Sequence, residues 1–307
     1  MRGPAGVKDA QGAFLTNPGQ DYTFEAMIYL ITGIILSTIF GQIMKWAVVR
    51  GCSTAQAAAV NYCIAAGAAA AFGLMMQGLR FNGQVLAIGI LGGVSYAIAV
   101  VVIFQVIRVA GIAITGTLMR VAVMVPVLGG IFFFKEMPTA VQWIGMGLTV
   151  ASMILLRPAG SMHPQQKVGW AAIIGMILIV ITNGAGFLAW KMIHFYGCDG
   201  QSQEFLCLLF GIPALTCAAE SAGRRDGLVR AAIIIGILLG LTNVCSVSTS
   251  LEALRTIPSV IFFPVYSCGG VILNAGLAAV LWREQLTREN GAGIALGCLA
   301  LVCMNPG

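Results

Sequence analysis

Arg120 is the residue whose type and position most directly indicate binding chemistry in this sequence. It stands in GTLMRVAVMVP, nine residues into an apolar stretch at 111–134. An arginine at the centre of a bilayer costs at least about 2.5–3.5 kcal/mol, so its side chain is expected to face a cavity or a partner. A guanidinium grips a carboxylate or a phosphate with paired hydrogen bonds. The sequence therefore predicts an anionic or zwitterionic ligand at Arg120.

The acidic residues leave a second interpretation of Arg120 open. All eleven Asp and Glu residues fall in tails, connectors or the ends of apolar stretches. In the alternative interpretation, the guanidinium is a structural clamp that bonds helix-end carbonyls or Glu252. The same distribution disfavours proton coupling through a central carboxylate, because such relays use intramembrane Asp, Glu or His.

Uncharged polar residues near the middles of the apolar stretches form a second set of candidates. At a shift of 147 residues, Ser95-Tyr96 coincides with Thr242-Asn243. Amides and hydroxyls at this depth can bond a ligand, although they also tie helices together for about 0.6 kcal/mol each. The predicted substrate-binding residues are Arg120, Tyr96, Asn243, Asn183, Asn61, Tyr266 and Thr117.

Two lysines, Lys45 and Lys191, each precede a Gly-Cys pair by six residues, at a shift of 146. A lysine near the end of a span can snorkel to the interface, so anchoring is one interpretation. In the other, each lysine belongs to a gate and pairs with an acid such as Glu204 or Glu252 when one face closes. We include Lys45, Lys191 and Glu252 as gating candidates.

The elements that must position these residues follow from a duplication. The segments KEMPTAVQWIGMGLTVASMILL and REQLTRENGAGIALGCLALVCM align at a shift of 148, which pairs Glu136 with Glu284 and Thr139 with Thr287. We expect the two glutamates to cap the helices that follow them. A duplicated hydrophobic unit is typical of secondary transporters, whose substrate site lies between the halves.

Ten stretches are apolar and close to the length of about 20 residues that a transmembrane helix needs. Because lipid cannot satisfy free backbone groups, these spans must be helices. Five spans in each half would reverse the second half in the membrane. The sequence thus predicts an all-α integral membrane protein of ten transmembrane helices in two inverted five-helix repeats. The expected spans are 27–47, 55–77, 84–106, 111–134, 139–157, 168–190, 203–221, 230–252, 257–281 and 291–305. The expected regions are a polar N-terminal tail at 1–26, a first repeat at 27–157, a linker at 158–167 and a second repeat at 168–305.

Composition excludes several classes of protein. Hydrophobic residues make up 59% of the chain and charged residues 9%, against about 25% charged in soluble domains. The net charge of +6 is spread thinly, so no nucleic-acid partner is predicted. The nine cysteines mostly lie in apolar stretches, where a thiol acts as a small hydrophobe. Their spacing indicates no metal site, and we expect no cofactor.

The sequence resembles the drug/metabolite transporter superfamily in its ten-helix EamA-type form. The resemblance rests on the connectors at Glu136 and Glu284, on PVLGGIFFFKE and GLAAVLWRE before them, and on the Gly-containing spans after them. It covers residues 27–305. It implies a cavity lined by spans 1–4 and 6–9, with spans 5 and 10 as scaffold, and function as a carrier of small metabolites.

We therefore expect a multi-pass protein of the cell inner (plasma) membrane that is no enzyme. It would move a small organic metabolite (an amino acid, a carboxylate or a phosphorylated compound) by alternating access, as a monomer or homodimer among membrane lipids. Alternatives are a lipid-flipping or non-transporting membrane subunit and a membrane-embedded transferase. Six Lys/Arg on the terminal side against ten on the other place the termini outside by the positive-inside rule. The resemblance implies cytoplasmic termini, and we favour that orientation.

Overall fold

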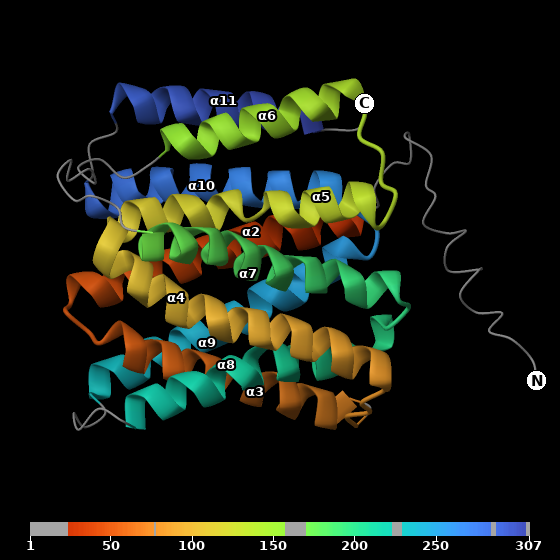
Figure 1. Cartoon of the computed structure of the whole chain (residues 1–307), viewed down its shortest axis with the longest axis vertical. Helices are drawn as coiled ribbons and strands as arrows, with labels where there is room; N and C mark the ends of the chain where they lie inside the picture. Colours follow the sequence, from red (N-terminus) through yellow and green to blue (C-terminus); the bar gives the residue numbers. More distant parts are fainter. Residues whose placement is uncertain (1–23, 77, 157–169, 223–228, 284–286, 305–307) are drawn as a thin grey trace, which may run out of the picture.

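A computed structural model describes residues 24–76, 78–156, 170–222, 229–283 and 287–304 of the chain. The N-terminal tail as far as residue 23 and the predicted linker at 158–167 lie outside the described residues. Figure 1 shows the described helices running side by side as a bundle, with α6 and α11 paired along one edge. The elements are α2 (Phe24–Val49), α3 (Thr54–Met76), α4 (Gly83–Val121), α5 (Met124–Phe132), α6 (Ala140–Leu155), α7 (Trp170–Phe195), the short η1 (Asp199–Gln201), α8 (Ser202–Ala222), α9 (Arg230–Leu254), α10 (Ser259–Trp282) and α11 (Arg288–Met304).

The helices identify the chain as a membrane protein. Among the described residues, seven helical segments are long and apolar enough to cross a membrane, and no strand is present. The seven are α2, α3, residues 83–107 of α4, residues 172–195 of α7, residues 199–220 in η1 and α8, α9 and α10. The three remaining predicted spans correspond to shorter helical segments: residues 118–132, α6, and the 17-residue α11.

The largest departure from the predicted boundaries concerns the third and fourth spans. The connector expected at 107–110 is helical, because the 39-residue α4 continues to Val121. The chain nevertheless reverses direction between Val106 and Val125, before most of α5. In chain order, Tyr96, Val106, Val125 and Phe134 lie against Gly186, Gly175, Gly184 and Phe195 of α7. From residue 96 to residue 106 the contacts run toward the start of α7, and from residue 125 to residue 134 they run toward its end. These two segments are therefore antiparallel, as two successive membrane spans must be.

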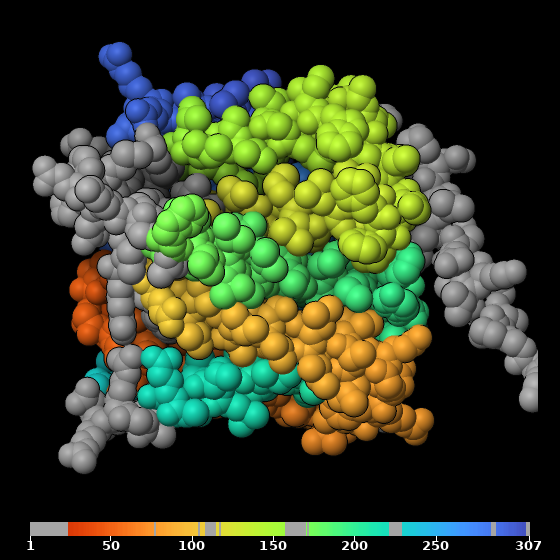
Figure 2. Space-filling view, viewed as in Figure 1, coloured from red at the N-terminus to blue at the C-terminus, as the bar shows by residue number. Residues whose placement is uncertain are grey.

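Many large apolar side chains are exposed on the surface, and a few charged side chains are buried. On α7, Ile174 and Ile181 are 62% and 54% exposed, whereas Lys191 is 1% exposed and Glu204 on α8 is 5% exposed. Figure 2 shows side chains of α4, α5, α6, α7 and α8 filling the spaces between the ribbons on one side of the bundle. Apolar side chains facing lipid and charged groups facing the interior are what a bilayer favours.

The helix ends form two faces. The Glu136 face, on the right in Figure 1, is where α5, α7 and α9 end. Glu136, Asp199 and Arg255 follow these helix ends in the chain. The Lys45 face, on the left, is where α2 and α10 end, and there Lys45 lies close to Trp282.

Matching turns occur at corresponding places in the two halves of the chain. Within the described residues, the non-glycine residues with positive φ are Lys135 (59°) and Arg283 (52°), which are 148 positions apart. Gly51 (66°) and Gly197 (69°), 146 positions apart, also adopt the left-handed conformation. This conformation is costly for residues with a Cβ, so its occurrence at the ends of both α5 and α10 marks the same turn in each half.

The cap of α6 corrects one prediction about Glu136. Thr139 caps α6: its hydroxyl accepts from the N–H of Gln142, whose side chain accepts in return from the N–H of Thr139. The aligned Thr287 accepts from the N–H of Asn290. The threonines are the capping residues, and the carboxylate of Glu136 is directed to other partners described below. Glu284 lies outside the described residues.

Candidate functional site

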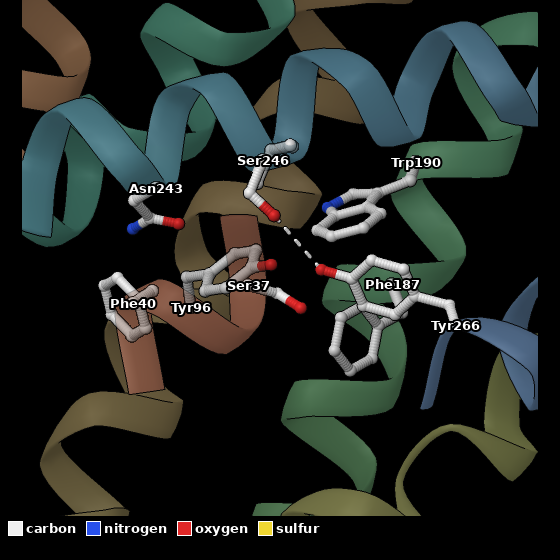
Figure 3. A pocket seen from close by; sticks show the side chains of 9 residues that line it. Ser37, Phe40, Tyr96, Phe187, Trp190, Asn243, Ser246 and Tyr266 are labelled. Atoms are coloured by element: carbon white, nitrogen blue, oxygen red, sulfur yellow. Dashed lines mark hydrogen bonds between the residues drawn. The ribbon is translucent and has the colours of Figure 1, made fainter. Parts of the chain in front are cut away.

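A cavity of about 140 Å³ lies between helices of the two halves of the chain. Five helices contribute to it: α2, α4, α7, α9 and α10. Aromatic rings form much of its wall, and three small polar side chains complete it (Figure 3). The lining residues are Ser37, Phe40, Tyr96, Phe187, Trp190, Asn243, Ser246, Val247 and Tyr266.

The aromatic rings hold one another at steep angles. Trp190 is 2% exposed and meets Tyr266 at 80° with ring centroids 6.3 Å apart. It meets Phe187 at 84° and 5.1 Å. Edge-to-face packing of this kind is favourable because the ring edge is positive and the ring face negative. The walls are therefore fixed by their own contacts.

Hydrogen bonds within the protein fix the polar side chains of the cavity. The Ser246 hydroxyl donates to the carbonyl of Gly33 at 3.1 Å and lies 3.3 Å from the Tyr266 hydroxyl. Asn243 donates through Nδ2 to Oδ1 of Asn61 at 3.3 Å. α2, α3, α9 and α10 are thus joined at one depth in the bundle.

Tyr96 reaches the cavity because Gly186 leaves room for its ring. A Cβ added at Gly186 would lie 3.2 Å from Cε2 of Tyr96. Contacts this short are tighter than ordinary van der Waals packing. Glycine at this position thus allows α7 to lie directly against the tyrosine ring.

The Glu136 face holds a buried ion pair. Lys191 Nζ lies 3.2 Å from Oε1 of Glu136, with the two side chains 1% and 8% exposed. The ammonium also donates to the carbonyls of Leu254 and Ile257, both at 3.3 Å. The second carboxylate oxygen accepts from the N–H of Val260 at 3.2 Å. This pair joins the end of α7 to the connector after α5 and to both sides of the turn between α9 and α10.

A second, more exposed charged group lies on the same face. His194 Nδ1 is 2.5 Å from Oδ1 of Asp199, and Asp199 is 3.6 Å from Nε of Arg255. Arg255 donates to Glu252 at 2.8 Å, and the two side chains are 47% and 36% exposed. That hydrogen bond raises the pKa of the Arg255 guanidinium. Glu252, predicted as a partner for a gating lysine, instead pairs with this arginine.

The gating lysines have different surroundings. Lys45 Nζ lies over the Trp282 ring, 5.3 Å from its centroid, and Trp282 Nε1 donates to Gln42 at 2.8 Å. Gln42 in turn donates to Asn274 at 3.1 Å. The predicted acid Glu204 accepts from the backbone N–H of Arg80 at 2.7 Å. The acid that pairs with Lys191 is Glu136, which sequence reasoning had placed in a capping role.

Arg120 lies outside the lining of the cavity. Its guanidinium donates to the carbonyl of Leu156, at the C-terminal end of α6, at 3.1 Å. This hydrogen bond matches the clamp interpretation, in which the side chain bonds a helix-end carbonyl. A cation at that end of a helix also interacts favourably with the helix dipole. The prediction of an anionic ligand is thereby left without the residue on which it rested.

The structure brings together four of the seven predicted binding residues. Tyr96, Asn243 and Tyr266 line the cavity, and Asn61 is hydrogen-bonded to Asn243. Asn183 is buried and donates to the carbonyl of Ile179 within its own helix, and Arg120, on α4, is bonded to the carbonyl of Leu156 at the end of α6. The side chain of Thr117 lies outside the described residues.

Sequence reasoning missed most of the aromatic wall. Phe40, Phe187 and Trp190 were passed over because aromatic residues in apolar stretches usually face lipid or the core. A signal was nevertheless available: Phe40 and Phe187 each lie about one helical turn before a repeat-equivalent lysine, Lys45 or Lys191.

Comparisons with known proteins address the fold. No protein-family model matches the chain, and no curated protein matches it. A solved structure described as "Crystal structure of protein" is similar, with a TM-score of 0.73 and 14% sequence identity over 91% of this chain and 95% of its own. At this identity the likeness concerns the fold alone.

Proposed function

We propose that the protein is a secondary transporter of small organic metabolites, built as two inverted five-helix repeats of the EamA type within the drug/metabolite transporter superfamily. The central cavity is the substrate site. The observation that carries this proposal is the position of the cavity, which is enclosed by α2 and α4 from the first half and by α7, α9 and α10 from the second. Carriers with inverted repeats bind their substrates at the interface between the repeats.

Backbone geometry and packing support the repeat. The paired left-handed turns at Lys135 and Arg283, and at Gly51 and Gly197, recur at nearly equal shifts. Helix neighbours correspond in the same way: α2 packs on α9 and α10, as α7 packs on α4 and α5, while α3 and α8 pack on each other, as do α6 and α11. Exchange of the two halves thus maps the most extensive helix contacts onto one another. If the chain reverses before α5 as it does between the other helices, the described helices would make the ten membrane crossings that the sequence predicts.

The buried ion pair supports alternating access. In this conformation Lys191 and Glu136 join α7, α9 and α10 at the Glu136 face, between the cavity and that side of the membrane. We assign this pair as the gate of that face. Substrate would leave toward it only after the pair separates and water reaches both charges, which limits how often the gate opens. The equivalent lysine, Lys45, would serve the opposite face.

Transport is tested in liposomes that contain the purified protein. The assay is uptake of labelled cationic, neutral, zwitterionic and anionic metabolites, with exchange against unlabelled solute inside. We expect saturable uptake of at least one class, accelerated by internal substrate. Asn243→Leu should reduce it at least tenfold, because it removes a polar group of the cavity and its hydrogen bond to Asn61. The lipid-facing variant Trp143→Leu is the matched control and should transport normally.

Two native cysteines report on the gate. Cys198 is buried at the Glu136 face and Cys52 is half-buried near the Lys45 face. Modification of each thiol by a water-soluble maleimide is followed by mass spectrometry. The double variant Lys191→Met/Glu136→Gln should increase the reactivity of Cys198 several-fold. Unchanged reactivity of Cys198, together with the absence of saturable uptake for every solute class, would overturn the proposal.

A further inference from the structure

Aromatic rings line the cavity from several directions. Trp190 stands nearly perpendicular to both Tyr266 and Phe187. In Figure 3 these three rings occupy one side of the cavity, while Phe40 and Tyr96 approach from the other. A cation held within about 6 Å of several ring faces is attracted to each of them.

The hydrogen-bond donors of the cavity are largely used within the protein. The Ser37 hydroxyl donates to the carbonyl of Ile34 at 2.9 Å, and Ser246 donates to Gly33. Because the proton of Ser246 is used, the neighbouring Tyr266 hydroxyl is the group that donates between these two. Asn243 uses Nδ2 on Asn61, so its Oδ1 remains an acceptor. The small polar groups therefore offer lone pairs, which suit a ligand that donates.

Two donors depart from this pattern: Trp190 Nε1 and the hydroxyl of Tyr96 beside it. The indole nitrogen is buried and makes no hydrogen bond of ordinary geometry among the described residues, and Figure 3 shows it on the side of the indole that faces the cavity. Leaving such a donor unsatisfied is unfavourable. A ligand that places a hydroxyl or carbonyl oxygen near this N–H would satisfy it.

The cavity offers an anion no cationic partner. Among the described residues that line the cavity, none carries a formal charge. Lys191, next to Trp190 in sequence, has its ammonium paired with Glu136, and Arg120 is bonded to the end of α6. An anion would therefore be desolvated without a cationic partner, which is costly. An ammonium ion would meet ring faces and lone pairs.

The volume of the cavity limits the part of the ligand that it encloses. An apolar cavity of about 150 Å³ accepts benzene, and this one measures about 140 Å³. The enclosed group therefore has about five to eight non-hydrogen atoms.

We propose that this cavity binds the ammonium group of a small organic cation that carries a hydroxyl or carbonyl oxygen close to the nitrogen. The aromatic walls would surround the charged nitrogen, and Trp190 Nε1 would donate to the oxygen. This inference rests on the proposed function in taking the cavity as the substrate site, but binding is measured independently of transport.

Three probes of nearly equal shape test the charge. Choline carries a quaternary ammonium, 3,3-dimethylbutan-1-ol replaces it with an uncharged carbon, and 3,3-dimethylbutanoate is an anion. Each is titrated against the purified full-length protein in detergent, with thermal stabilisation and tryptophan fluorescence as readouts. We expect choline to bind at least tenfold more tightly than the neutral alcohol, and the anion to bind more weakly than either.

Variants of Trp190 distinguish the contribution of its aromatic ring from that of its N–H group. Trp190→Phe keeps an aromatic wall and should weaken choline binding less than Trp190→Leu, which should weaken it at least tenfold. Substitution of the almost fully buried Trp190 could impair folding, so Phe40→Leu, at a partly exposed position, provides a second test. We expect this variant to weaken choline binding several-fold. Trp143→Leu, on the exposed surface of α6, should leave choline binding unchanged.

The outcomes distinguish this inference from the proposed function. If choline binds and yet no solute is transported, the carrier proposal fails while the ammonium site stands. If another solute is transported while choline neither binds nor competes, the carrier proposal stands and the ammonium site is overturned. Equal affinity for choline and the neutral alcohol, or tighter binding of the anion, would also overturn it.

Discussion

Lys191 and Lys45 occupy corresponding places in the two halves of the chain but have different surroundings. Lys191 is 1% exposed and is held by Glu136 and two backbone carbonyls. Lys45 is partly exposed and lies on the Trp282 ring at the opposite face. Two similar sequences thus hold one residue type in two local arrangements. Under the proposed function, the difference corresponds to two faces at different stages of closure.

The largest effect should come from removing only one of the two charges in the Lys191–Glu136 ion pair. Lys191→Met leaves Glu136 buried without its cation and should lower the free energy of unfolding by about 3–5 kcal/mol. Thermal unfolding in detergent measures the change. Adding Glu136→Gln should recover a large part of the loss, because both charges are then removed. A double variant as unstable as the single one would mean that the pair acts through packing and that its charge is unimportant.

Arg120 provides a contrast with both lysines, because the structure gives it a helix end as partner. Arg120→Met removes a charge-assisted hydrogen bond to Leu156 and should cost about 1.5–3 kcal/mol of unfolding free energy. The KM for transported solute should stay within twofold of the original protein. A large rise in KM with unchanged stability would restore the earlier prediction that Arg120 binds substrate.

A smaller effect is expected where α7 lies against Tyr96. Gly186→Ala puts a methyl group 3.2 Å from the tyrosine ring and should cost about 1 kcal/mol, the lower end for overpacking. Ligand affinity should fall several-fold, since the ring must shift within the cavity. Gly67→Ala, where nothing lies within 4 Å of the added Cβ, is the matched control. That change should stabilise the helix by up to about 1 kcal/mol, and a similar loss at both sites would contradict the role of Gly186.

The smallest effect should come from Lys45→Met. A partly exposed cation–π contact contributes about 0.5–1 kcal/mol, so thermal stability should fall far less than in Lys191→Met. Transport should slow if Lys45 belongs to the second gate, and its rate is measured in the same liposomes. A loss of stability as large as that of Lys191→Met would show that the two faces are equivalent, and the comparison would fail.

Most helices could be predicted from the sequence, because long apolar stretches in a chain with few charges leave little alternative in lipid. The boundary between the third and fourth spans could not be predicted well. The expected loop at 107–110 is helical, and only the neighbours of Val106 and Val125 on α7 locate the reversal. Within the site, the shift of 147 correctly brought Tyr96 and Asn243 to one depth, and the structure places both in the cavity.

The roles of the charged residues could not be predicted in the same way. Arg120 bonds a residue 36 positions away, and Lys191 and Glu136 pair across different helices of the bundle. Periodicity indicates depth in a membrane but carries no information on which helix lies opposite. Because an unpaired charge in lipid is costly, a charged residue in a span must have a partner. The sequence does not show which residue that partner is.

By itself, the sequence determined that this chain is helical, belongs in a membrane and repeats a pattern, because hydrophobic length and backbone satisfaction depend on local composition alone. The tertiary structure decided that the arginine bonds a helix end, that a lysine and a glutamate form a buried ion pair, and that five aromatic rings line one cavity. Those outcomes depend on contacts between distant segments, whose distances only the packed helices set.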